Sequence, residues 1–260
     1  MKLSELFNLL ENIGPLSISN EFCKKCGSYD NSGILVDSGE DIAGVLFSLD
    51  LSAKALEEAK KRGYNAIVTH HPVIFGAISS VSINNSRTSL IAECLKSGIS
   101  VISMHLNFDA APEGIDHHLM QGLGGNECKT MTTLSVGAYG RVYDVKPLKL
   151  ADYIEFIKKN FSTDRVIYYG EDDKIIKRVS SFCGAGCDDT AINFAVEEGA
   201  DVLVSSDMKH HHIAALLSRG ISVIILTHYA SENYGFNKIY GKIIEELNVP
   251  AAYFCDKALL

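Results

Sequence analysis

The sequence predicts an α/β protein built from two related lobes with mostly parallel sheets. Short, continuously apolar segments alternate with segments of helical periodicity, as in sheets that helices cover on both faces. A similar phrase also occurs twice, at residues 98–109 and 220–232, each time as an apolar run followed by a histidine and, four residues later, a carboxylate. A helix, a glycine, an apolar run and then polar residues precede both copies, at 55–71 and 190–207.

The first half begins with apolar residues at helical spacing, which predict a helix over residues 3–13 that ends at Gly14-Pro15. Residues 16–42 are rich in Gly, Ser, Asn and Asp, and we expect irregular chain there with one short strand. The other elements expected in this half are strands at 45–49, 66–69 and 100–103, and helices from Ser52 to Arg62, over 88–97 and from Asp116.

The second half begins with a different rhythm over residues 128–180. Strands are expected at Met131–Val136 and Arg165–Tyr169, around a helix at 148–160. The repeated pattern then predicts strands at 178–182, 201–205 and 222–226, helices at 189–198, 211–218 and 232–247, and a last strand at 251–255. We expect a first lobe over 1–125 and a second over 126–260.

Composition excludes several classes of protein. The chain has 260 residues, 47% of them apolar, and a net charge of −8. No basic run is longer than Lys60-Lys61-Arg62, so a nucleic-acid surface is not expected. No apolar stretch approaches the roughly 18 residues of a membrane span. The seven cysteines are odd in number and scattered, which favours reduced thiols and a cytoplasmic location.

Two adjacent histidines follow the expected strand 66–69, in the phrase Thr69-His70-His71-Pro72. Adjacent side chains on a strand point to opposite faces, so both histidines reach one site only where the strand ends. Pro72 favours such an end, and ligands bind at the carboxyl ends of strands in open α/β sheets. The alternative is one buried and one exposed imidazole without a metal.

The second copy of the repeated phrase ends in His228-x-x-x-Glu232. A pair four residues apart lies on one face of a helical turn, and imidazole with carboxylate suits Zn, Fe, Mn or Ni. The same spacing is common on solvated helices, but here it directly follows an apolar strand. We therefore expect both side chains to be metal ligands.

The first copy ends in His105-x-x-x-Asp109 at the equivalent place. Asn107 and Pro112 disfavour a regular helix, so we expect Asp109 in a loop. Asp109 as the cap of a turn is the alternative. The equivalent position of His228 and Glu232 favours a metal role.

These residues together give more ligands than one ion needs. A single Zn takes three or four protein ligands, so a larger set indicates two divalent ions about 3.5–4 Å apart, bridged by a carboxylate and a water. Glu232 is the bridge that we expect. The candidate metal ligands are His70, His71, Asp109, His228 and Glu232, with His105 and Asp207 nearby.

Three consecutive histidines lie in Asp207-Met208-Lys209-His210-His211-His212. They point about 100° apart on a helix, so one or two at most face a common site. We expect Asp207 and His211 to orient ligands or contact substrate, while His210 and His212 are equally well explained as surface residues. Lys209 either neutralises an anionic substrate or is simply exposed.

Two further motifs are weaker indications of a functional site. Gly184-Ala185-Gly186 can cradle a phosphate, but the following Asp188-Asp189 would repel an anion, so a tight turn is the better interpretation. Cys23-x-x-Cys26 is half of a zinc knuckle, and no second pair has matching spacing.

Over nearly its whole length the chain resembles the Nif-three-like dinuclear-metal family, also labelled GTP cyclohydrolase 1 type 2. The run from Thr69-His70-His71-Pro72 through Phe75 is the most specific of the matching motifs. The others are Tyr29-Asp30-Asn31-Ser32-Gly33, Ser48-Leu49-Asp50, Met104–Asp109, Gly184-Ala185-Gly186, Ser206-Asp207-x-Lys209-His210-His211 and His228-Tyr229-x-Ser231-Glu232. Tyr29 stands where the family usually has Trp.

The resemblance implies the Nif-three-like fold without the domain inserted in longer members. It implies the same five metal ligands, with the site at converging strand ends, and a homo-oligomer that in this family is a ring-shaped hexamer. The leading hypothesis is a hydrolase with two divalent ions per subunit, whose metal-bound hydroxide attacks a nucleotide-like or other small anionic substrate. His105, Asp207 and His211 are its candidate catalytic residues.

Two alternatives stay open. The first is a phosphoesterase that uses the same two metals. The second is a protein that binds metal ions or regulatory partners without turnover. The family label implies opening of the guanine imidazole ring of GTP, but nothing in the residue spacing selects a purine.

Overall fold

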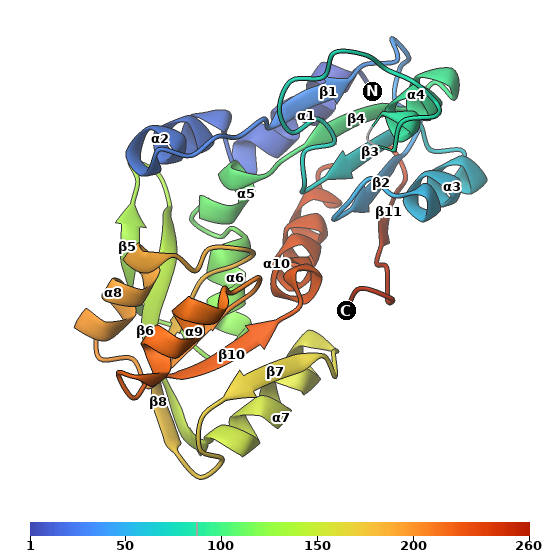
Figure 1. Ribbon diagram of the computed structural model, residues 1–260. Helices are drawn as coiled ribbons and strands as arrows, with labels where there is room; N and C mark the ends of the chain where they lie inside the picture. The colour runs from blue at the N-terminus through green and yellow to red at the C-terminus, as the bar shows by residue number, and fades with distance from the viewer. Residues whose placement is uncertain (87) are drawn as a thin grey trace. The chain divides into compact units, whose positions relative to one another are not determined.

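A computed structural model describes residues 1–86 and 88–260 and confirms an α/β fold with two sheets (Figure 1). The chain forms two compact units, one of Met1–Ala111 and Phe236–Cys255, the other of Pro112–Gly235 and Asp256–Leu260. Helix α10 (His228–Ile243) begins in the second unit and ends in the first. The lobes 1–125 and 126–260 stay a prediction.

The first unit contains a five-stranded sheet in the order β1-β4-β3-β2-β11. Figure 1 shows β3 between β4 and β2. All neighbours are parallel except β1 and β4. The strands are β1 (Gly33–Val36), β2 (Val45–Ser48), β3 (Ala66–Thr69), β4 (Ser100–Ser103) and β11 (Ala251–Phe254). The helices that lie wholly in this unit are α1 (Leu3–Ile13), α2 (Leu16–Cys26), α3 (Ala53–Arg62), α4 (Ser89–Lys96) and α5 (Leu106–Ala110).

Three parallel strands of this sheet end at the same level. Ser48 of β2 lies opposite Thr69 of β3, and Thr69 lies opposite Ser103 of β4. All residues of the three strands are buried, and a polar residue follows the end of each strand within two positions. The register therefore brings Asp50, His70, His71 and His105 to the same end of the sheet, at the carboxyl ends of these strands.

The prediction of irregular chain after residue 16 was wrong over α2 (Leu16–Cys26). Pro15 precedes the helix, and Gly27 ends it with a left-handed φ of 64°. Ile18 and Phe22 are buried four residues apart on one face of this helix. This apolar pair fixes the segment as helix despite its polar composition.

The second unit contains a six-stranded sheet in the order β5-β6-β8-β9-β10-β7. Only β8, β9 and β10 run parallel to one another, while β5, β6 and β7 pair antiparallel. The antiparallel strands come from residues 128–169, where the sequence rhythm differs. The strands are β5 (Cys128–Thr133), β6 (Ala138–Lys149), β7 (Val166–Tyr169), β8 (Ile175–Ser181), β9 (Val202–Ser205) and β10 (Ser222–Leu226). The helices that lie wholly in this unit are α6 (Ile115–Gly122), α7 (Leu150–Phe161), α8 (Asp189–Glu197) and α9 (His210–Leu217).

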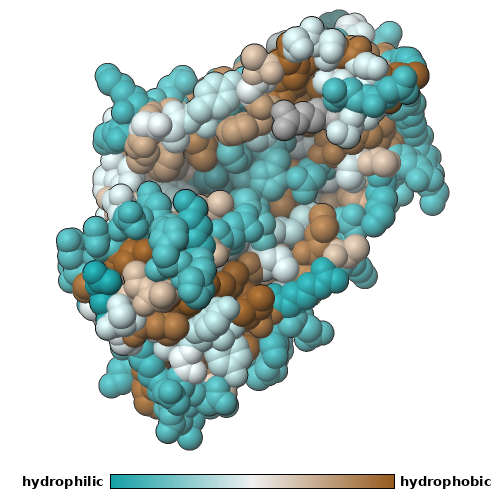
Figure 2. All heavy atoms as spheres, in the orientation of Figure 1, coloured by the Kyte–Doolittle hydropathy of each residue, from teal (hydrophilic) through white to brown (hydrophobic). Residues whose placement is uncertain are grey.

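The visible surface mixes hydrophilic and hydrophobic side chains (Figure 2). Among the helices of the described chain, none is both long enough and apolar enough to cross a bilayer.

A buried ion pair ties α6 to β6 in the second unit. The Arg141 Nε lies 2.9 Å from the Asp116 Oδ2, and both side chains are almost fully buried. Asp116 also accepts the backbone N–H of Gly140 at 3.1 Å. Burial lowers the pKa of Arg141, but Asp116 and Cys128 outweigh it and raise that pKa, so the guanidinium stays charged.

We expect Asp116→Ala to lower the free energy of unfolding by about 3–5 kcal/mol, because it leaves the Arg141 guanidinium buried without its counter-charge. The matched control is Asp144→Ala, which removes the partner of Arg178 from a pair in which Asp144 is 71% exposed. That variant should cost less than about 1 kcal/mol. Urea unfolding measures both, and equal losses would contradict the interpretation.

Candidate metal centre

His70 directly follows β3 and is fully buried, and a backbone carbonyl fixes its ring. Its Nδ1 lies 2.8 Å from the Met104 carbonyl oxygen, just after β4. A carbonyl only accepts, so Nδ1 carries the proton and Nε2 presents its lone pair in the neutral ring. The Nε2 lies 3.4 Å from the Asp109 Oδ1. This tautomer is the one that binds a metal through Nε2.

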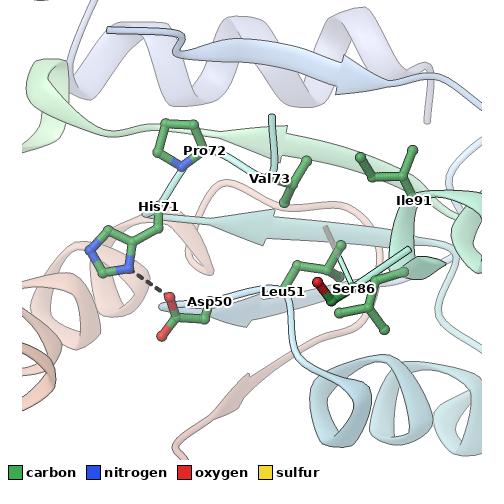
Figure 3. Close-up of a pocket in the computed structure, with 8 residues that line it drawn as sticks. Asp50, Leu51, His71, Pro72, Val73, Ser86 and Ile91 are labelled. Carbon is green, nitrogen blue, oxygen red and sulfur yellow. Dashed lines mark hydrogen bonds and ion pairs between the residues drawn. The ribbon is translucent and has the colours of Figure 1, made fainter. Parts of the chain in front are cut away.

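His71 is held by a residue that follows β2, on the opposite side of β3 from β4. Its Nδ1 lies 2.7 Å from an oxygen of Asp50, which follows β2, and Figure 3 shows the two side chains meeting beyond adjacent strand ends. A cavity of about 210 Å³ opens beside them. It is lined by Asp50, Leu51, His71, Pro72, Val73, Ser86, Leu90 and Ile91.

His105 follows β4, and Asp30 holds it. Its Nδ1 lies 2.8 Å from the Asp30 Oδ1, and its backbone N–H donates to the Ser32 Oγ at 2.9 Å. Burial raises the pKa of Asp30, but hydrogen bonds from His105, Ser19 and Ser32 outweigh it and lower that pKa to about 2. Asp30 is therefore an anion at neutral pH and favours a proton on the Nδ1 of His105.

These three imidazoles converge in the first unit. One ring nitrogen from each of His70, His71 and His105 lies within 4.8 Å of the other two. The ring of His70 lies 5.0 Å from that of His71 and 5.1 Å from that of His105, between centroids. Because each Nδ1 faces an anchor, each Nε2 presents its lone pair in the neutral ring, and a pair of such imidazoles suits a divalent metal with the third ring beside it.

Asp109 was predicted in a loop, and this was wrong. It is buried in the short helix α5, and its backbone N–H donates to the His105 carbonyl at 3.0 Å. Asn107, which disfavours helix by propensity, donates its side-chain amide to the Gly14 carbonyl at 2.5 Å. Tertiary contacts thus stabilise one helical turn that the sequence alone does not.

The second unit places His228 and Glu232 on successive turns of α10. The helix begins at His228, four residues earlier than predicted. The His228 Nε2 lies 3.1 Å from the Glu232 Oε1, and its Nδ1 lies 2.5 Å from the Asp207 Oδ2. Asp207 follows β9 and has a φ of 47°, which is uncommon for a residue other than glycine. This imidazole is anchored in the same way as that of His71.

Gly184, in the turn after β8, lies against Glu232. A Cβ at this position would come within 2.2 Å of the Glu232 Oε1 and 3.3 Å of the His228 Nε2. The Gly184 N–H also donates to the Ser231 Oγ at 3.1 Å. The expected tight turn has a second purpose, since glycine lets the backbone approach the Glu232 carboxylate.

The three consecutive histidines of α9 differ in burial. His210 and His211 are exposed, and the ring of His211 packs 4.3 Å from that of His212. His212 is buried, with its Nε2 3.6 Å from the Asp189 Oδ1, so the surface interpretation was wrong for it. The catalytic role of His211 stays a prediction.

The zinc-knuckle motif on α2 finds no support. Over residues 1–86 and 88–260, neither Cys23 nor Cys26 belongs to a group of side chains placed to hold a metal ion. Both thiols are free.

Comparison with known proteins decides the family. The Duf34/NIF3 (NGG1p interacting factor 3) profile matches residues 1–256. This chain belongs to the Duf34/NIF3 family. A relative from Clostridium perfringens, named GTP cyclohydrolase 1 type 2 homolog, is 27% identical over 99% of this chain and 97% of its own length.

Two further similarities agree with this. A Campylobacter jejuni protein, also named GTP cyclohydrolase 1 type 2 homolog, is 30% identical over 95% of this chain and 93% of its own length. The crystal structure of a hypothetical protein from Staphylococcus aureus matches with a TM-score of 0.86 at 25% identity, covering 98% of this chain and 97% of that one. The family profile and this structural match therefore both extend over nearly the whole chain.

Sequence reasoning missed three residues of the candidate centre. Asp30 and Asp50 lie in motifs that resemble the family, but no spacing rule pairs them with histidines far along the chain. Gly184 was explained by turn geometry alone. A carboxylate just after a buried strand was the available signal for Asp50, because Asp50 follows β2 and β2 is a neighbour of β3, the strand that ends before His71.

We expect Gly184→Ala to weaken metal retention by about 10–100-fold, as changes around a ligand commonly do, because the new methyl displaces Glu232. Gly199→Ala is the matched control, since Gly199 has a similar positive φ of 69° but nothing within 4 Å of an added Cβ. Both variants should lose stability from backbone strain, and only the first should lose metal. Metal analysis after dialysis measures this, and equal retention would contradict the expectation.

Proposed function

We propose that this Duf34/NIF3 protein is a hydrolase that depends on two divalent metal ions per subunit. One observation carries the proposal. Each histidine among the proposed ligands has its Nδ1 against an oxygen, and the Nε2 atoms of His70 and His228 lie 3.4 and 3.1 Å from the carboxylates of Asp109 and Glu232. The proposed metal ligands are His70, His71, Asp109, His228 and Glu232.

The residues around these ligands have separate roles in the proposal. Asp50 and Asp207 orient His71 and His228 through their Nδ1 protons. His105 carries a proton on Nδ1 against the Asp30 anion, so its Nε2 can accept a proton from a reacting group. Divalent ions, when bound, supply Lewis acidity that favours hydrolysis at neutral pH.

The substrate that we propose is nucleotide-like. The Clostridium perfringens and Campylobacter jejuni relatives are both named GTP cyclohydrolase 1 type 2 homolog. This name supports hydrolysis of a purine nucleotide, with ring opening of GTP as the first reaction to test. From the family resemblance we further propose a homo-oligomer, with a hexamer as the expected form, that works in the cytoplasm.

The test combines metal content with turnover. Protein loaded with Zn, Mn, Fe or Ni is assayed with GTP and with a panel of phosphoesters. His71→Ala and Glu232→Ala should each lose bound metal, and their turnover should fall by at least about 100-fold. Removal of a ligand should lower activity more than a change in a residue beside a ligand does. His210→Ala is the control, since His210 is exposed on α9.

Each other outcome has a defined meaning. Two tightly held ions without turnover of any substrate would replace the hydrolase with a metal-binding or regulatory protein. Turnover of phosphoesters alone would identify a two-metal phosphoesterase. Turnover that survives both ligand variants would reject the proposed centre.

A further inference from the structure

Two aromatic side chains stand exposed beside the histidines of the first unit. Tyr29 is 56% exposed and Phe75 is 58% exposed. Their ring centroids lie 5.4 Å apart at an interplanar angle of 73°, in an edge-to-face arrangement. The ring of Phe75 also lies 6.1 Å from that of His105, at 84°. Neither ring has a role in the proposed metal chemistry.

Hydrogen bonds next to each ring hold this pair in place. Asp30, which follows Tyr29, binds the Nδ1 of His105 at 2.8 Å. The next residue, Asn31, donates its side-chain amide to the Ile74 carbonyl at 2.7 Å, one residue before Phe75. The segment of Tyr29 is thus bonded both to His105 and to the loop of Phe75. The two rings are preorganised although most of their surface faces solvent.

Such a pair has the properties of a stacking site. Large exposed aromatic rings that are held rigid bind partners with little loss of conformational entropy. Every heteroaromatic base has a π face, so it stacks on protein aromatics whatever its hydrogen-bonding pattern. The same loop also exposes the aliphatic residues Ile78, Val81 and Ile83, which offer apolar area without a π face.

We propose that Tyr29 and Phe75 form a subsite that stacks the planar heteroaromatic ring of the substrate beside His105. This inference deepens the proposed function and rests on it, because it names the part of the substrate held next to the histidines. It assigns the ring to the first unit and leaves the metal ligands unchanged.

The test compares two probes that differ in the ring. Guanosine 5′-monophosphate and ribose 5-phosphate share the sugar phosphate, and calorimetry measures their binding to metal-loaded and metal-free protein. The wild-type chain should bind the guanosine probe at least about tenfold more tightly in both states, since stacking contributes roughly 5–150-fold per base. Phe75→Ala and Tyr29→Ala should each remove most of this advantage, while Phe75→Tyr should keep it.

Ile83→Ala is the matched control, because Ile83 is 59% exposed on the same loop. It should leave the advantage unchanged. Circular dichroism and metal content should be the same in all of these variants. The subsite is overturned if the wild-type chain does not prefer the guanosine probe, or if both Phe75→Ala and Tyr29→Ala keep the preference.

The two proposals fail in different ways. If the guanosine preference depends on Phe75 and Tyr29 but no metal loading gives turnover, the hydrolase fails and the subsite stands. If turnover depends on His71 and Glu232 but the guanosine preference is absent, the subsite fails and the hydrolase stands.

Discussion

The orientation of the imidazole rings is the constraint on which the candidate centre depends. His70, His71, His105 and His228 each have Nδ1 within 2.8 Å of an oxygen that belongs to a carbonyl or a carboxylate. An oxygen of this kind favours a proton on Nδ1 and leaves the Nε2 lone pair for a cation. Without these anchors each ring would be free to rotate or change tautomer, and a metal would have to order it at a cost in free energy.

The parallel sheets provide the anchors. His71, after β3, is held by a residue after β2, and His228, after β10, is held by Asp207 after β9. In each unit the histidine and its partner follow neighbouring parallel strands, whose register brings their ends to the same level. The same arrangement of histidine and carboxylate therefore occurs in each unit, although in the repeated phrase the residue opposite His228 is His105, which Asp30 holds.

Much of the fold and part of the candidate centre could be predicted from the sequence, because buried strands and the polar residues after them are local signals. The α/β fold, the strand before His70 and the strand before His228 are of this kind. The features that the sequence did not predict depend on tertiary contacts. The turn that carries Asp109 is stabilised by the bond from Asn107 to Gly14, and Asp30 reaches His105 across 75 positions. No periodicity encodes such pairings.

The proposed centre requires His70, His71 and His228 to hold divalent ions through Nε2. Anomalous diffraction from a crystal grown with manganese or zinc tests it most directly, because the signal locates the ion itself. We expect peaks at about 2.0–2.2 Å from the Nε2 atoms of His70, His71 and His228, with Nδ1 still facing its oxygen. Peaks elsewhere, or a metal bound through Nδ1 with the anchors broken, would contradict it.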